Sequence, residues 1–239
     1  MYPAWPLVSS YTKGTLGFSQ RAVVAEQLEQ SKAEKAGFRE QIANNELAEI
    51  KANPELLSFA LAGGAAAFGD NCAPCHGRGA QGAVGYPNLR DDAWLWGGSL
   101  DDIHQTIRYG IRGDHPETRN SQMPAFGRLG MLQPPQVNDV AEYVLALSGN
   151  AEDQEAAERG GAMYTTNCAA CHGTDGVGNQ ALGAPNLADE LWLYGGDKAS
   201  IVETITNSRS GMMPAWNERL DPATVKELAI YVHSLGGGE

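Results

Sequence analysis

The segments Cys72-Ala73-Pro74-Cys75-His76 and Cys168-Ala169-Ala170-Cys171-His172 contain every cysteine of this 239-residue chain. Both follow C-x-x-C-H, the attachment signature of c-type haem, in which two thiols form thioethers with the vinyl groups of one haem. The adjacent histidine faces the iron as its proximal ligand. The two copies therefore predict two covalently bound haems c, attached through Cys72, Cys75, Cys168 and Cys171, with His76 and His172 as iron ligands.

Two other kinds of site could use these cysteines. Four thiolates could surround a structural zinc ion, and a single C-x-x-C could be a redox dithiol of the thioredoxin kind. The histidine that follows both copies and the Met-Pro dipeptide downstream of each argue against zinc. A thioredoxin-like motif would lie in a βαβ setting, and no β-rich run flanks either copy. Haem attachment is the reading that the sequence favours.

The similarity between the two copies, which begin 96 residues apart, extends far beyond the cysteines. Each is followed by a glycine-rich loop ending in Pro-Asn-Leu, a Trp-Leu-aromatic-Gly-Gly element, a short helix, Met-Pro-Ala and a closing helix. No stretch has convincing β periodicity, so we predict an all-α fold. We expect a lead-in over residues 1–55, a first domain over 56–149 and a second over 155–239, with the polar stretch 148–154 as linker.

The lead-in contains a predicted helix over residues 19–50, rich in Ala, Glu, Gln, Lys and Leu, with Gly37 and Asn44-Asn45 as its weak points. Its apolar positions are sparse, so we expect it to pack on a partner or against the domains. Asn53-Pro54 indicates the start of the next helix, with Asn as N-cap and Pro in the first turn. The opening residues 2–8 resemble the interfacial end of a membrane span.

An electron-transfer haem needs a second strong axial ligand, and a thioether sulfur in that position favours Fe(II) and raises the reduction potential. The Met-Pro repeat supplies Met123 and Met213, which lie 51 and 45 residues beyond the first cysteine of their own motifs. A lone methionine is usually core filler, but a repeat in register favours ligands. The nearby alternatives are Met131, Met212 and His115, of which the histidine would lower the potential of its haem.

Six further residues are candidates for contacts around the haems. A proline carbonyl can accept from the Nδ1–H of each proximal histidine and orient the ring. Indole N–H groups can bond haem propionates, and guanidinium groups can pair with them. Simple packing or a solvated charge is the alternative for each. These candidates are Pro87, Pro185, Trp94, Trp192, Arg112 and Arg209.

The composition is that of a globular protein with a formal net charge of -12. This charge argues against nucleic acid and anionic membrane surfaces as partners. It favours a partner with a basic face, although it also serves solubility. No apolar run approaches the roughly 18 residues that a spanning helix needs, and no signal peptide opens the chain. Because haem c is normally attached outside the bacterial cytoplasm, we expect a removed leader or a fragment.

The ordered set of motifs resembles the class I cytochrome c domain, and more narrowly the dihaem subunit III of cbb(3)-type cytochrome c oxidase. The matching features are C-x-x-C-H, Pro-Asn-Leu, the Trp-Leu-Trp/Tyr-Gly-Gly elements at 94–98 and 192–196, Met-Pro-Ala, and the Tyr-Val pairs at 143–144 and 231–232. Residues 14–17 resemble the segment after the membrane anchor of that subunit. The resemblance implies two tandem class I cytochrome c domains preceded by an N-terminal helical extension.

The resemblance also implies a function without bond-breaking chemistry on this chain. Electrons would enter from a soluble or membrane-bound cytochrome c, or from a cytochrome bc complex. They would pass through the monohaem subunit to the catalytic subunit, which reduces oxygen. That family has an N-terminal transmembrane helix and this sequence has none, so we expect a chain that begins just after the anchor, on the periplasmic side of the bacterial inner membrane.

Two rival functions use the same motifs. A free periplasmic dihaem electron carrier would share all the haem residues, but it has little need of the helix over residues 19–50. A dihaem peroxidase or a thiosulfate-oxidising cytochrome is the enzyme alternative. A peroxidase needs an iron whose sixth position can open, and two Met-Pro repeats argue against it.

Overall fold

The computed structural model describes residues 19–237. This part of the chain contains ten α-helices, one short 3₁₀-helix and no β-strand beyond isolated bridges. The predicted all-α class is therefore confirmed. The expectations for residues 2–8 and 14–17 lie outside the described residues. None of the helices in 19–237 is long and apolar enough to cross a bilayer.

The first helix is shorter than the sequence predicts. Helix α1 spans Gln20–Asn44, with the Ser19 hydroxyl accepting from the Ala22 N–H at 3.3 Å. It ends at the predicted weak point because Glu46 forms a capping box with Glu49 and starts a new helix, α2, Leu47–Ala52. Among the described residues, 19–45 form a unit of their own and 46–237 form a second unit.

Within the second unit, each C-x-x-C-H motif follows a longer helix. Helix α3 spans Pro54–Asn71 and leads into α4, Ala73–His76. Helix α7 spans Gln154–Asn167 and leads into α8, Ala169–His172. Asn53 caps α3 as expected, since its side-chain oxygen accepts from the N–H groups of Glu55 and Leu56. Each haem motif therefore forms the same helical turn at the end of a helix.

The remaining helices also occur in equivalent pairs. Helix α5 (Leu100–Tyr109) corresponds to α9 (Lys198–Asn207), and α6 (Pro134–Leu147) corresponds to α10 (Pro222–His233). The 3₁₀-helix η1, Gln180–Leu182, lies in the loop after the second motif. Ser99 and Asp197 cap α5 and α9 through their side chains. The repeat seen in the sequence is thus a repeat of helices.

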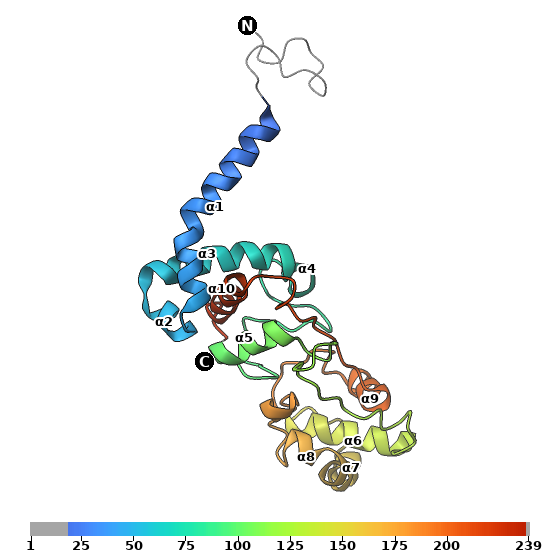
Figure 1. Cartoon of the computed structure of the whole chain (residues 1–239). Coiled ribbons are helices and arrows are strands. Elements are labelled where there is room, and N and C mark those ends of the chain that lie inside the picture. The colour runs from blue at the N-terminus through green and yellow to red at the C-terminus, as the bar shows by residue number, and fades with distance from the viewer. Residues whose placement is uncertain (1–18, 238–239) are drawn as a thin grey trace. The chain divides into compact units, whose positions relative to one another are not determined.

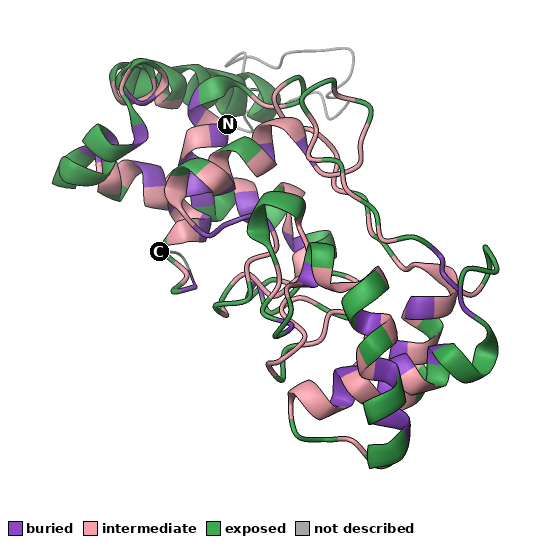
Figure 2. Ribbon diagram, turned by 90° about the horizontal axis from the view of Figure 1, so that it is seen from below, coloured by how far each residue is buried: buried purple, intermediate pink, exposed green. Residues whose placement is uncertain are grey.

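The packing of these helices crosses the expected boundary between residues 149 and 155. Helix α3 packs against α10, which also packs against α5, whereas α6 packs against α7 and α9 (Figure 1). Two separate groups of buried residues result, and Figure 2 colours the buried residues purple along the ribbon. The first core comprises Phe68, Ala73, Ala80, Ile103, Ile107, Val225, Leu228, Ala229 and Val232. The second core comprises Phe126, Leu132, Val137, Val140, Ala141, Val144, Leu145, Tyr164, Ile201 and Ile205.

Equivalent close crossings hold the two helix pairs together. A Cβ atom on Gly64 would collide with the backbone oxygen of Glu227 in α10 and lie 2.6 Å from the Cβ of Tyr231. A Cβ atom on Gly160 would collide in the same way with the backbone of Asp139 in α6. An aromatic pair stands beside each crossing: Phe68 with Tyr231 at 5.5 Å between ring centroids, and Tyr143 with Tyr164 at 4.9 Å.

The short connection over residues 148–153 gives a physical reason for this pairing. Helices joined by a few residues usually pack as antiparallel neighbours. Arg159 of α7 also forms a two-pronged ion pair with Asp139 of α6, with contacts of 2.7 and 3.0 Å. The stretch expected to link two domains is therefore the turn of a helical hairpin inside one core.

Candidate functional site

The two C-x-x-C-H motifs adopt the same backbone conformation. Cys72 and Cys168 lie at the N-cap of the short helices α4 and α8, and each accepts through its carbonyl from the N–H of its histidine at 2.9 Å. A glycine ends each turn: Gly77 at φ +80° and Gly173 at φ +79°, a region that side chains with a Cβ rarely adopt. Both cysteines of a motif thus lie within a single turn beside the histidine.

The first thiol of each motif lacks the lowered pKa of a reactive redox dithiol. Burial, and then the neighbouring thiol of the same motif, raise the pKa of Cys72 and of Cys168 to about 11. Reactive dithiols depend on a lowered pKa, so these thiols stay protonated at neutral pH. Over residues 19–237 no three His, Cys, Asp or Glu side chains group as they would around a metal ion. The zinc alternative therefore has no geometric support.

The proximal histidines are oriented by the proline carbonyls named from the sequence. The Nδ1 atom of His76 lies 3.0 Å from the carbonyl oxygen of Pro87, and that of His172 lies 3.1 Å from the oxygen of Pro185. A carbonyl can only accept, so Nδ1 carries the proton and Nε2 keeps a free lone pair. Burial lowers the pKa of both histidines below the ordinary value. A neutral ring with a free Nε2 is what an iron ligand requires.

The second motif opens into a largely apolar cavity of about 220 Å³. Cys168, Cys171 and His172 line it together with Met123. The apolar wall consists of Phe126, Val140, Val144, Tyr164, Ile201 and Ile205. Two thiols, an imidazole and a thioether around an apolar cavity fit a covalently attached haem, which is a flat, mainly apolar body with iron at its centre.

Two arginines line the same cavity. Arg112 donates from Nε to the carbonyl of Gly211 at 2.6 Å and from Nη1 to the carbonyl of Ser121 at 3.0 Å. Arg209 stacks over the ring of Tyr194 and donates to Thr204 Oγ1 at 2.6 Å. The sequence motifs place one arginine in each half, whereas the structure brings both to one cavity. They are the cations that could face haem propionates there.

The first motif is surrounded by the first core. Cys72 and Met213 both pack against that core, together with Trp94, Leu89 and Trp216. The indole N–H of Trp94 donates to the carbonyl of Gly237, so the chain itself supplies its acceptor. A half-buried thiol, a thioether and aromatic side chains around an apolar core repeat the chemistry of the second site.

The alternative iron ligands named from the sequence lie in positions that suit an axial ligand less well. Met131 and Met212 are 52% and 69% exposed. His115 stacks on Tyr109, accepts from the Glu117 N–H at Nδ1, and has Nε2 3.2 Å from the amide nitrogen of Asn217. Of the candidate ligands named from the sequence, Met123 and Met213 are the ones that pack against the two cores beside a haem motif.

Comparison with known proteins agrees with this chemistry. The family model described as "Cytochrome C oxidase, cbb3-type, subunit III" matches residues 59–144 and 155–232. The chain belongs to this family. It is 54% identical to the cbb3-type oxidase subunit FixP of Azorhizobium caulinodans, across all of this chain and 81% of the relative. It is 51% identical to the CcoP subunit of Azospirillum brasilense and 50% to that of Cereibacter sphaeroides, across 83% of each.

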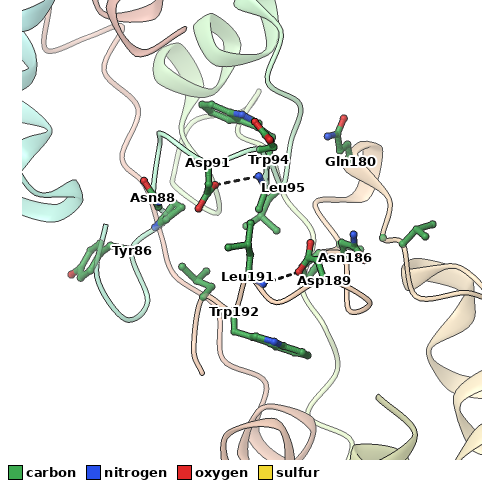
Figure 3. A pocket seen from close by; sticks show the side chains of 18 of the residues that line it. Tyr86, Asn88, Asp91, Trp94, Leu95, Gln180, Asn186, Asp189, Leu191 and Trp192 are labelled. Carbon is green, nitrogen blue, oxygen red and sulfur yellow. Dashed lines mark hydrogen bonds between the residues drawn. The ribbon is translucent and has the colours of Figure 1, made fainter. Parts of the chain in front are cut away.

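This subunit III chain also has a larger cavity, of about 530 Å³, between the loops that follow the two haem motifs (Figure 3). Pro87 and Pro185 line it, as do Trp94 and Trp192, whose rings lie at opposite ends of the view. The two sides are built alike: Asp91 accepts from the Ala93 N–H at 3.2 Å, and Asp189 accepts from the Leu191 N–H at 3.0 Å. The loops that follow the two haem motifs therefore face each other across this cavity.

The sequence motifs did not reveal several contacts that shape the sites. The hydroxyl of Ser208 donates to the carbonyl of Met123 from a left-handed backbone position, φ +60°. The backbone N–H of Gly85 donates to the carbonyl of Leu193 at 2.8 Å. No spacing signal announces such contacts between the two repeats, because each repeat contains the same elements.

Proposed function

We propose that this chain binds two haems c covalently, through Cys72 and Cys75 in the first half and Cys168 and Cys171 in the second. His76 and His172 are the proximal iron ligands, and Met123 and Met213 are the distal ones. The observation that carries the proposal is the repeated arrangement itself. Around each of the two apolar cores lie a C-x-x-C-H turn, a histidine bonded to a proline carbonyl, and a methionine.

Haem iron supplies reversible one-electron transfer between its ferric and ferrous states. The chain holds two strong axial ligands for each iron, so that neither iron offers an open position to oxygen or peroxide. The role of this subunit is therefore to receive and pass on single electrons, with no bond-breaking chemistry on the chain. Such a role fits its membership of an oxidase family.

We infer that the donor is a cytochrome c or a cytochrome bc complex, and that the acceptor is the catalytic core of the oxidase, reached through its monohaem subunit. The net charge of -12 supports a donor with a basic face. Because haem c is normally attached outside the bacterial cytoplasm, the two C-x-x-C-H motifs support a location on the periplasmic side of the bacterial inner membrane. Contact with the membrane then runs through partner subunits or an anchor.

The test combines haem content with electron delivery. The native oxidase complex is purified with this subunit, and the haem covalently bound to the chain is counted in the unmodified protein and in the variants C72A/C75A and C168A/C171A. We expect two haems in the unmodified chain and one in each variant, with oxygen consumption from reduced cytochrome c lowered in both. Carbon monoxide binding to the reduced subunit, or a preparation without oxidase subunits, would contradict the proposal.

A further inference from the structure

We propose that Trp96 and Arg119 bind a propionate group of the first haem, the one beside His76. The indole N–H of the tryptophan and the Nε–H of the arginine donate to the propionate oxygens. This assignment rests on the proposed function, since it takes haem attachment as given and names the residues that hold the acidic edge of the haem. Neither residue is among the haem contacts predicted from the sequence motifs.

Trp96 and Arg119 each bring a buried donor for which the chain supplies no acceptor. Trp96 is 8% exposed, and within residues 19–237 its Nε1 atom has no hydrogen-bond partner. The Nε atom of Arg119 is also buried and lacks an acceptor in that part of the chain. The guanidinium carbon lies 5.5 Å from the centroid of the indole ring, so the two groups are neighbours. Because buried N–H groups are nearly always bonded, we expect a ligand with acceptor atoms beside them.

The two donors define the chemistry of this ligand. An indole nitrogen and a guanidinium can only donate, so the ligand has to supply acceptors. The positive charge of Arg119 favours an anion, and its planar fork matches a carboxylate. Asp102 accepts from Nη2 of Arg119 at 2.9 Å, which leaves the Nε–H for a second acceptor. A haem propionate is the carboxylate that haem attachment brings to this site.

The second half of the chain contains an equivalent pair, Tyr194 and Arg209. The guanidinium of Arg209 stacks over the Tyr194 ring at 4.9 Å, as that of Arg119 stacks over Trp96. Nη2 of each arginine donates to the carbonyl of the third residue of a helix, at 3.3 Å in α5 and at 2.6 Å in α9. Arg119 is therefore the structural counterpart of Arg209, a place that the order of the sequence motifs gives to Arg112.

The equivalent pair shows which site the first pair serves. Tyr194 and Arg209 both line the cavity that contains the second haem motif. By the same repeat, Trp96 and Arg119 belong to the site of the first haem motif. The two arginines differ in one contact: Nε of Arg209 donates to the hydroxyl of Thr204 at 3.0 Å. The first site therefore keeps a donor that the second site has already used.

An insertion in the first half delivers Arg119 to this position. Met123 lies 14 residues beyond the end of α5, whereas Met213 lies 6 residues beyond the end of α9. The additional residues form a closed loop, because the Arg119 N–H donates to the carbonyl of Gly110 at 3.1 Å and the Arg112 N–H donates to the carbonyl of Arg119 at 2.8 Å. The backbone of Arg119 is thus held in place before any ligand binds.

The deciding experiment keeps only the first haem in the full chain, through a C168A/C171A background. W96F removes the indole N–H and keeps an aromatic ring, whereas R119K keeps the positive charge and loses the Nε–H. We expect each substitution to shift the propionate carboxylate band in redox-difference infrared spectra. We also expect each to lower the midpoint potential, because the negative charge of the propionate is then less compensated near the iron.

Two arms of this experiment separate the propionate from other anions and from general effects. Haem labelled with ¹³C at its propionate carboxyl groups distinguishes the propionate band from bands of protein carboxylates and of free anions. R128K is the matched control, because Arg128 is exposed, and it should change neither the band nor the potential. In a C72A/C75A background, where only the second haem remains, W96F and R119K should also leave both unchanged.

A labelled band that neither W96F nor R119K shifts in the first background would overturn the propionate site. An equal shift in R128K, or a shift of the second haem alone, would overturn it as well. If W96F lowers haem incorporation because its ring is buried, R119K decides by itself. In each of these cases covalent haem at the first motif still supports the proposed function, whereas an unmodified chain that binds no haem would overturn that function.

Discussion

The backbones of Ile111 and Met213 are joined by two hydrogen bonds, in which each residue donates to the other at 2.9 and 3.0 Å. Ile111 lies two residues beyond Tyr109, where the helix that packs on the first core ends, and Met213 is the methionine beside that core. The bridge therefore fixes the segment bearing Met213 against an element of the first repeat. Any displacement of this methionine has to move the segment that leads on to Met123.

Helix α3 offers a matched pair of glycines to test the close helix crossing. Gly64 faces the backbone of α10, whereas nothing lies within 4 Å of a Cβ built on Gly69. We expect G64A to lower the free energy of unfolding by about 1–3 kcal/mol, because α3 and α10 must move apart. G69A should raise it by up to ~1 kcal/mol through helix propensity. Denaturant unfolding of the holoprotein measures both, and equal effects would argue against the tight crossing.

The elements of this fold could be predicted from the sequence because they depend on local signals. Asn53-Pro54 caps a helix wherever that helix finally packs, and C-x-x-C-H imposes a turn regardless of the partner helix. The contacts of His76 and His172 with proline carbonyls could likewise be predicted, since a single loop joins each motif to its Pro-Asn-Leu segment. The end of α1 at Asn44 was signalled only by the two asparagines that weaken that helix.

The pairing of the helices could not be predicted from the repeat. Gly64 and Gly160 are equivalent, as are Tyr143 and Tyr231, so either closing helix offers a suitable surface to either haem-motif helix. Similarity between repeats identifies the contacting faces but not which copies meet. The short connection at 148–153 was the available signal, because it favours a hairpin of α6 with α7. A polar composition there suggested a domain linker instead.

Arg112 provides a prediction for the potential of one haem. Its guanidinium lines the cavity of the second site, and a cation there stabilises propionate charges and the ferrous state. We expect R112Q to lower one of the two midpoint potentials and leave the other nearly unchanged. A spectroelectrochemical titration of the two-haem protein measures this, with R128Q as control because Arg128 is exposed. If R128Q lowered the same midpoint potential by as much as R112Q, the effect would come from the overall charge of the protein and not from a local contact.

The acidic charge of the chain predicts a salt-dependent encounter with its donor. Opposite charges speed association, and the effect is screened within about 8 Å at physiological ionic strength. With a formal net charge of -12, the subunit should be reduced by a basic cytochrome c more slowly as salt rises. Stopped-flow reduction over a range of ionic strength tests this. A rate that is independent of salt, or one that rises with it, would exclude electrostatic steering by this charge.

An ion pair between a buried glutamate and a partly exposed lysine lies beside the turn between α6 and α7. The fully buried Glu142 of α6 contacts Lys198 of α9 at 2.7 Å, and its other oxygen accepts from the N–H groups of Glu152 and Asp153 at 3.0 and 3.3 Å. Replacing Glu142 by glutamine removes the negative charge that pairs with Lys198. The amide oxygen can still accept from the N–H groups of the turn. We expect E142Q to lower the free energy of unfolding by about 1–3 kcal/mol at neutral pH.

The same pair gives a definite pH dependence. The hydrogen bond from Lys198, followed by those from the turn N–H groups, holds the pKa of Glu142 below its ordinary value of 4.5. A lowered pKa means that the carboxylate stabilises the fold above about pH 4.5 and that this contribution is lost as pH falls through the folded-state pKa. The stability difference between the unmodified protein and E142Q should therefore be largest at neutral pH and shrink in acid. E158Q, at an exposed position of α7, should show no such trend in unfolding titrations; a constant difference for E142Q would instead point to a packing defect.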